Sequence, residues 1–159
     1  MTLEPERAAR LQFLVRVVRK ECAHLATTDQ RLFAEPFTLV HAEKLATDVD
    51  LAERVEAFVG RFSRLQDTVG DKLLPQLLSA LGERPGAAID NLDQAERLGL
   101  IASADEWMII RKLRNQMIHE YVEDLAVLVS ALQTGHTYAP TLLRSAEAMI
   151  GEIERRGWV

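Results

Sequence analysis

The chain has 159 residues, of which 27% are charged, and a formal net charge of -5. This length matches one domain with a substantial buried core, so we expect residues 1–159 to form a single domain. Gly and Pro number only 8 and 5, too few for the many turns of a β-sandwich or barrel. The chain has no apolar run of the roughly 20 residues that span a membrane, and its first residues lack the pattern of a signal peptide. We therefore expect a soluble, cytoplasmic protein with no membrane partner.

The single cysteine, Cys22, excludes an internal disulfide and a cysteine-based zinc cluster. It lies in an apolar helical stripe, where a small buried thiol is the ordinary arrangement. The chain also lacks a Gly-rich phosphate loop, a His-Glu-x-x-His motif and a Gly-x-Ser-x-Gly elbow. We expect neither a metal nor another cofactor. The negative net charge argues against a surface that is basic throughout, but a local basic patch can still bind nucleic acid.

Apolar residues recur at helical spacing from the start of the chain and predict a first helix from about Glu4 to Arg31. Pro5 suits the first turn of that helix. Pro36 disfavours helical backbone at the residue before it, so the helix ends ahead of it. The segment from Phe33 to about Thr47 is compatible with either a loop or a short helical turn.

The second predicted helix begins near Asp50, with Glu53 placed to complete a capping pair, and runs to about Leu81. Pro75 is expected to kink this helix. A turn at residues 82–86 then leads to a short helix over about 87–98, which ends at a glycine.

Ser103–Glu106 has the spacing of a capping box and predicts a further helix from about Ala104 towards Tyr121. The last segment contains Gly135 and Pro140, but its apolar residues keep a seven-residue phase across both. We therefore predict one kinked helix from about residue 123 to residue 156. The phase is carried by Leu125, Leu132, Ala139, Ala146 and Ile153. The predicted fold class is all-α, an up-and-down bundle of four or five helices.

The four histidines differ in their sequence surroundings. His24 and His41 stand alone and His136 falls near the buried phase of the last helix, so for each a packed or solvated side chain is the simpler interpretation. His119 instead closes a segment, from residue 107 to residue 119, that has three basic residues and no acidic one. Arginine can hold a phosphate through two hydrogen bonds, and histidine exchanges a proton near neutral pH. Phosphodiester cleavage requires both properties, although a solvated helix face with a capping histidine fits the same residues.

The pattern Arg-Asn-x-x-x-His-x-Tyr is filled here by Arg114, Asn115, His119 and Tyr121. This pattern, late in a helix of a small α-bundle, resembles the motif of HEPN domains. Its tyrosine-bearing form is similar to the HepT-like toxins and to the partner proteins of minimal nucleotidyltransferases. The resemblance covers the whole motif and the predicted helical layout over most of the chain.

The resemblance implies a homodimer whose two motif helices face each other and form a cleft that cleaves RNA without a metal. Arg114 would steady the phosphate and His119 would handle the proton, which makes these two the predicted catalytic residues. Tyr121 would be the residue on which a minimal nucleotidyltransferase antitoxin places adenylate groups. The neighbouring basic residues Arg111 and Lys112 are predicted to bind the RNA, and tRNA is among the candidate targets.

Helical geometry gives independent support for a site shared between subunits. Arg114 and His119 are five residues and roughly 140 degrees apart on an ideal helix, so they do not converge within one subunit. A two-fold axis or an unwound helix end would bring them together. Asn115 and His119 share a face at i and i+4, so Asn115 can support the site by orienting His119 or the phosphate.

Three functions are compatible with the sequence. The first is an endoribonuclease that acts as the toxin of a toxin-antitoxin pair. The second is a non-catalytic subunit that presents substrate to a separately encoded nucleotidyltransferase. The third is a structural dimerisation bundle, which the motif disfavours because Arg, Asn and His are poor choices for an interface that needs only apolar contact.

Overall fold

A computed structural model of the chain describes residues 2–119 and 124–159. Within these two ranges every regular element is helical and no strand occurs, which confirms the predicted all-α class. The elements are α1 (Pro5–Leu32), α2 (Leu39–Glu43), η1 (Lys44–Ala46), α3 (Val49–Asp67), η2 (Thr68–Leu73), α4 (Leu74–Ala80), α5 (Ala88–Arg97), α6 (Ala104–His119) and α7 (Leu125–Arg155).

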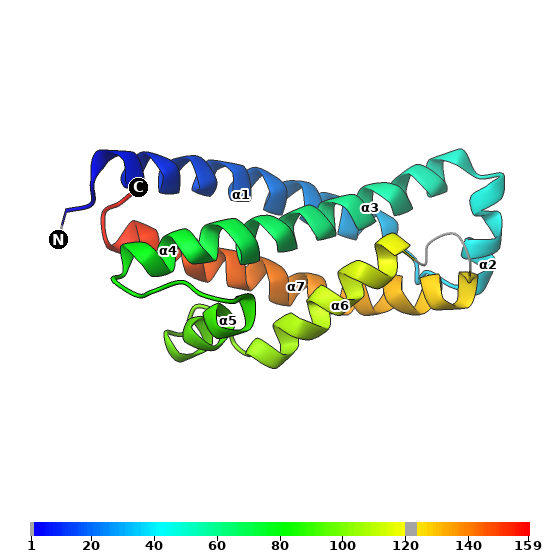
Figure 1. Cartoon of the computed structure of the whole chain (residues 1–159). Coiled ribbons are helices and arrows are strands. Elements are labelled where there is room, and N and C mark those ends of the chain that lie inside the picture. Colours follow the sequence, from blue (N-terminus) through cyan, green and yellow to red (C-terminus); the bar gives the residue numbers. More distant parts are fainter. Residues whose placement is uncertain (1, 120–123) are drawn as a thin grey trace.

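The long helices lie alongside one another, and the two ends of the chain lie at the same end of the molecule (Figure 1). Helix α1 packs along α3 and α7, and α4 continues the direction of α3. Helix α6 crosses this layer obliquely and packs against both α7 and α3. None of the helices in the described part of the chain is long and apolar enough to cross a membrane.

The core is formed by the apolar stripes that the periodicity predicts. Leu11, Leu14 and Val18 of α1 are buried in the same apolar cluster as Phe58 and Phe62 of α3, and α1 packs against both α3 and α7. Burial of such side chains stabilises each by about 1.5–3 kcal/mol, so the helices are held by packing rather than by intrinsic propensity. The buried cluster also includes Trp107, Ile110, Leu113 and Met117, which fix the inner face of α6.

The helix predicted from Asp50 differs from the structure at both its start and its interior. Its N-cap is Asp48, whose carboxylate accepts a hydrogen bond from the Leu51 N–H at 3.0 Å, so the predicted capping pair at Asp50 is wrong. Where Pro75 was expected to kink the helix, the six residues of η2 form a π-helical turn directly before α4. Pro75 occupies the first turn of α4, where its missing N–H is tolerated. The residues around 33–47 adopt the short helical elements α2 and η1.

Helix α6 begins at its predicted cap, and α7 begins at a cap that was not predicted from the sequence. The hydroxyl of Ser103 accepts a hydrogen bond from the Glu106 N–H, as the predicted capping box requires. Helix α7 begins after Asp124, whose carboxylate accepts hydrogen bonds from the N–H groups of residues 126 and 127. It continues as one helix through Pro140, which confirms a single last helix, and its predicted kink stays a prediction. Leu125, which belongs to the predicted apolar phase, is 39% exposed, because it lies at the very start of the helix.

Two glycines let neighbouring elements approach each other closely. A side chain at Gly70 in η2 would lie 3.1 Å from the indole of Trp107. A side chain at Gly135 in α7 would lie 3.0 Å from the ring of Phe58 and 3.5 Å from the sulfur of Met117. The absence of a Cβ therefore sets how closely α6, which carries the motif, packs against η2 at Gly70, and how closely α3 packs against α7 at Gly135.

Candidate functional site

Two side-chain hydrogen bonds fix the guanidinium group of Arg114, the first residue of the predicted motif. Its Nη2 donates a hydrogen bond to Oδ2 of Asp67 at 2.9 Å, and its Nη1 donates to Oδ1 of Asn115 at 3.0 Å. The side chain is 27% exposed, against 41% for Asp67. Its Nε is buried and has no hydrogen-bond partner among the described residues. The guanidinium is thus fixed in direction while part of its donor capacity is unused.

Arg114 borders an open hollow of about 440 Å³ between α3, η2 and α6. Four cationic side chains line this hollow, together with polar groups and two carboxylates. Arginine guanidinium groups suit phosphate because their planar N–H groups can make paired hydrogen bonds to it. The lining residues are Arg64, Gln66, Asp67, Thr68, Asp71, Lys72, Arg111, Arg114 and Asn115.

The structure divides the predicted basic stripe between two sides of α6. Arg111 lies at the hollow with Arg114, as adjacent helical turns allow. Lys112 instead lines a groove between α6 and α7, beside Ile109 and Val127. Arg111 and Arg114 thus lie on one side of the helix, and Lys112 is separated from them.

The two remaining motif residues lie at the edge of what the structure describes. His119 is the last residue of α6, and its side chain lies outside the described part of the chain. Tyr121 lies outside the described residues altogether. Its predicted modification and the predicted proton transfer at His119 therefore stay predictions.

A half-buried carboxylate lies next to the hollow on the side of α1. Oε1 of Glu21 accepts a hydrogen bond from the Thr68 hydroxyl at 3.1 Å, and Thr68 also lines the hollow. Burial raises the pKa of Glu21 above its ordinary value, and this outweighs the hydrogen bond from Thr68 and the nearby charges of Arg64 and Lys72, which lower it. Oε2 of Glu21 is buried and unpaired within the described ranges.

The other reactive side chains have structural surroundings. Burial raises the pKa of Cys22 to about 11, so this thiol is protonated and unreactive at neutral pH. His41 takes part in the capping box of α2 through Thr38, and His136 stacks on Phe33 and pairs with Asp29 at 2.8 Å. His136 is exposed, whereas the predicted last helix placed it near the buried phase.

Asp67, the anionic partner of Arg114, was not identified from sequence. It lies 47 positions away, at the last residue of α3, and no motif or local spacing connects the two. Arg64 and Lys72 were also not identified as site residues from the sequence, because the helix predicted over that segment shows only an amphipathic pattern. In the described part of the chain, no group of three or more His, Cys, Asp or Glu side chains is arranged to hold a metal ion.

Comparison of the chain with protein-family models, with curated proteins and with solved structures found no match.

Proposed function

We propose that the chain is a HEPN-like, metal-independent endoribonuclease that acts as the toxin of a toxin-antitoxin pair. The observation that carries the proposal is the hollow at Arg114. A fixed, partly buried arginine lies there beside Arg111, Arg64 and Lys72, in a protein whose net charge is -5. This arrangement suits one phosphate of an RNA backbone, and the motif that contains Arg114 supplies His119 at the end of the same helix.

The proposed reaction uses two groups. His119 removes the proton from a ribose 2'-hydroxyl, and the resulting oxygen attacks the adjacent phosphorus. The bond from phosphorus to the 5'-oxygen breaks, that oxygen takes up a proton, and a 2',3'-cyclic phosphate remains. Arg114 stabilises the negative charge that builds on the phosphate oxygens. Asp67 and Asn115 keep its guanidinium in one orientation, so little reorganisation is needed during the reaction.

The exposed side of α6 supports a homodimer with a shared cleft. Met108, Ile109 and Ile118 of this helix are 38–44% exposed. Met108, Lys112, Asn115 and position 119 follow one another at spacings of four, three and four, which places them in one row along the helix. Two such rows facing each other across a two-fold axis would cover the apolar side chains and bring each position 119 near the partner's motif.

Cleavage of RNA by purified protein in the presence of a chelator tests the proposal. We expect wild type to release fragments that end in a 2',3'-cyclic phosphate and to leave DNA intact, because DNA lacks the 2'-hydroxyl. His119→Ala and Arg114→Ala should each lower the rate about a hundredfold or more. His24→Ala is the matched control, since His24 is exposed and its side chain makes no hydrogen bond in the described ranges. Full activity of His119→Ala, or strict dependence on a divalent ion, would rule out this mechanism.

The Asp67–Arg114 pair also favours a second candidate function, the non-catalytic binding subunit of a separately encoded nucleotidyltransferase. A carboxylate 2.9 Å from the guanidinium offsets part of the positive charge that would stabilise a transition state. The remaining N–H groups could still bind and present a substrate phosphate. Tight RNA binding without any cleavage, unaffected by His119→Ala, would select this second function.

A further inference from the structure

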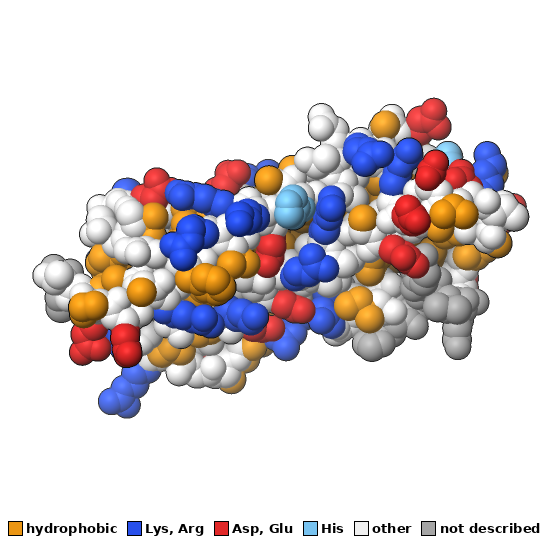
Figure 2. Space-filling view, turned by 90° about the horizontal axis from the view of Figure 1, so that it is seen from above, with side chains coloured by type: hydrophobic (Ala, Val, Ile, Leu, Met, Phe, Trp, Pro, Cys, Tyr) orange, Lys and Arg blue, Asp and Glu red, His pale blue; other side chains and the backbone are white. Residues whose placement is uncertain are grey.

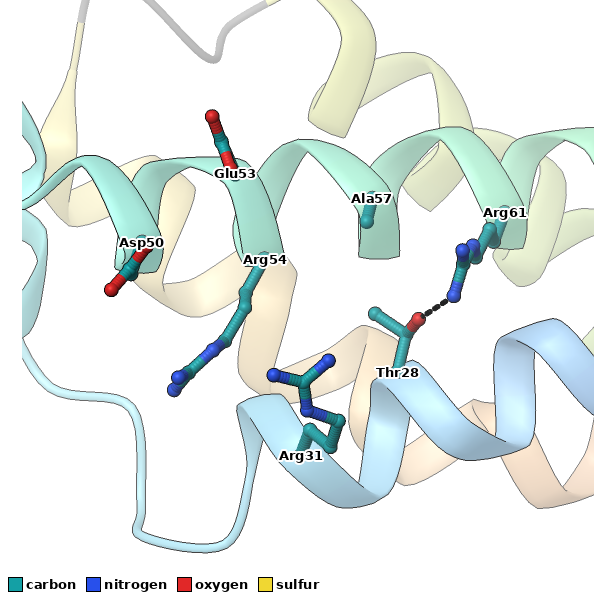
Figure 3. A pocket seen from close by; sticks show the side chains of 7 residues that line it. All are labelled: Thr28, Arg31, Asp50, Glu53, Arg54, Ala57 and Arg61. Carbon is teal, nitrogen blue, oxygen red and sulfur yellow. Dashed lines mark hydrogen bonds between the residues drawn. The ribbon is translucent and has the colours of Figure 1, made fainter.

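A second group of arginines lies between α1 and α3, away from the motif. Arg31 of α1 and Arg54 and Arg61 of α3 line an open hollow of about 300 Å³ together with Thr28, Asp50, Glu53 and Ala57. In Figure 3, Arg31 and Arg54 extend into the space between the two helices, and Arg61 reaches down to Thr28. The three guanidinium groups therefore converge from two elements on one open space.

Only Arg61 is held within this hollow. Its Nη1 donates hydrogen bonds to the hydroxyl of Thr28 and to the carbonyl oxygen of His24, the latter at 3.2 Å. Arg31 and Arg54 are exposed and form no salt bridge with any carboxylate in the described part of the chain.

Two carboxylates border the hollow, and neither forms a salt bridge with its arginines. Glu53 projects away from the arginines in Figure 3, and Asp50 lies at one end of their row. Three arginines and two carboxylates leave the lining with a net positive charge, and a bound anion reduces the repulsion between the arginines.

Arg64 of α3 lies between the arginine hollow and the hollow at Arg114 along the sequence of the helix. Arg64 lies one helical turn from Arg61 on α3 and also lines the hollow at Arg114, together with Lys72. Figure 2 shows Lys and Arg side chains along this face of the molecule, with Asp and Glu side chains among them. On the α1 side, exposed basic residues at spacings of four and eleven continue it, namely Arg16, Lys20 and Arg31.

The length of this face suits a polymer of phosphates rather than a single anion. From Arg54 to Lys72 the helix rise of about 1.5 Å per residue gives roughly 27 Å. A stacked strand with a phosphate about every 3.4 Å would place roughly eight phosphates over that distance. Both hollows are open to solvent along their length, as a strand passing through them requires.

We infer that the arginine hollow binds backbone phosphates of the RNA on one side of the phosphate held at Arg114. The inference rests on the proposed function only for the identity of the ligand as RNA. The strand passes from the hollow at Arg114 across Arg64 to Arg61, Arg31 and Arg54. Arg31 and Arg54 contact phosphates through their guanidinium groups and add affinity without contacting the reacting atoms.

Equilibrium binding tests this inference without depending on cleavage. A fluorescent single-stranded RNA of about 20 nucleotides is titrated with the His119→Ala protein and with the same protein carrying Arg31→Gln and Arg54→Gln. We expect the double substitution to weaken binding about tenfold or more near 0.1 M salt. Because each lost contact to a single strand removes about 0.7 from the slope of log affinity against log salt, the slope should fall by about 1.4.

The matched control carries Arg84→Gln and Arg97→Gln, which make the same change in net charge. Arg84 precedes α5 and Arg97 ends it, both are exposed, and α5 lies on the opposite side of the bundle from the α1–α3 face. We expect this control to keep the affinity and slope of its parent.

Two binding results would overturn the inference. The first is unchanged affinity and slope after Arg31→Gln and Arg54→Gln. The second is an equal loss in the Arg84→Gln and Arg97→Gln control, which would show that only net charge matters.

A cleavage assay separates this inference from the proposed function. Wild type and the Arg31→Gln, Arg54→Gln double variant are compared on the long RNA and on a dinucleotide that reaches only the hollow at Arg114. We expect kcat/KM to fall on the long RNA alone. If no substrate is cleaved but the double variant binds RNA more weakly as expected, the proposed function is wrong and the inference about the arginine hollow is supported. If both proteins cleave both substrates with equal kcat/KM, the inference about the arginine hollow is wrong, while the proposed function is supported.

Discussion

The two arginine groups of this molecule differ in how their guanidinium groups are held. Arg114 is 27% exposed and makes hydrogen bonds to Asp67 and Asn115. Arg31 and Arg54 are exposed and form no salt bridge in the ranges that the structure describes. A fixed guanidinium can place one phosphate with the precision that a reaction needs, whereas unpaired and mobile ones add long-range attraction. We therefore expect the hollow at Arg114 to position one RNA phosphate, and the arginine hollow to add affinity for the RNA.

Modification of Tyr121 should produce the largest difference in RNA binding between the hollow at Arg114 and the arginine hollow. Phosphates attached two residues after His119 would compete with RNA for the hollow at Arg114 and repel the backbone. Co-expression with a minimal nucleotidyltransferase should raise the mass of the chain by one or more adenylate units and abolish cleavage. Residual, salt-sensitive RNA binding through Arg31 and Arg54 should persist. Mass spectrometry of Tyr121→Phe is the control, and modification of that variant would show that the acceptor lies elsewhere.

Release of Arg114 from its anionic partner should have the next largest effect. In Asp67→Asn the guanidinium loses its ion pair and much of its orientation, so we expect cleavage to slow about ten- to a hundredfold. RNA affinity should stay the same or rise, because a negative charge has been removed from the hollow. Asp71→Asn is a matched control, since Asp71 lines the same hollow and forms no salt bridge among the described residues. Single-turnover rates would decide, and equal rates in both variants would show that Asp67 does not position Arg114.

Two glycines of α7, Gly135 and Gly151, allow a test of how tightly this helix is packed. Gly135→Ala would place a methyl group 3.0 Å from Phe58 and 3.5 Å from Met117, and such overpacking costs about 1–3 kcal/mol of the free energy of unfolding. Gly151→Ala meets no atom within 4 Å and should instead stabilise the helix by up to about 1 kcal/mol. Urea unfolding measures both. A gain at both positions would show that the packing of α3 against α7 does not depend on the close approach at Gly135.

The smallest expected effect concerns Glu21, beneath the hollow at Arg114. Its raised pKa means that the folded protein holds the proton more tightly than the unfolded chain. The stabilisation that this proton provides is complete below the unfolded pKa and is lost as the pH rises through the folded pKa. Glu21→Gln should therefore melt slightly higher than wild type at pH 7, and the difference should shrink towards pH 4. The exposed Glu56→Gln serves as the control in thermal melts, and a destabilised Glu21→Gln at pH 7 would mean that the charge is compensated.

Helical periodicity and caps determined the elements of this protein, because both are local properties of the sequence. The stripe of Leu11, Leu14 and Val18 predicts the buried face of α1, and Ser103 marks the start of α6 within one residue. The wrong predictions, the cap of α3 and the kink at Pro75, concern positions where the local sequence is compatible with more than one backbone structure. The start of α3 was predicted near Asp50, but the similar side chain of Asp48, two residues earlier, forms the cap. Pro75 was compatible with either a kink or a helix start after a π-helical turn.

The polar sites were decided by tertiary structure. The register of α3 against α6 brings Asp67 to Arg114, and the register of α1 against α3 brings Arg61 to Thr28. Neither register is encoded by spacing within one segment, because it depends on how side chains of different helices interlock. The same rotation of α6 that buries Leu113 places Arg111 and Lys112 on different sides of the helix. The sequence alone therefore determined which residues carry charge and which form helices, and only the packing of those helices decided which charges meet.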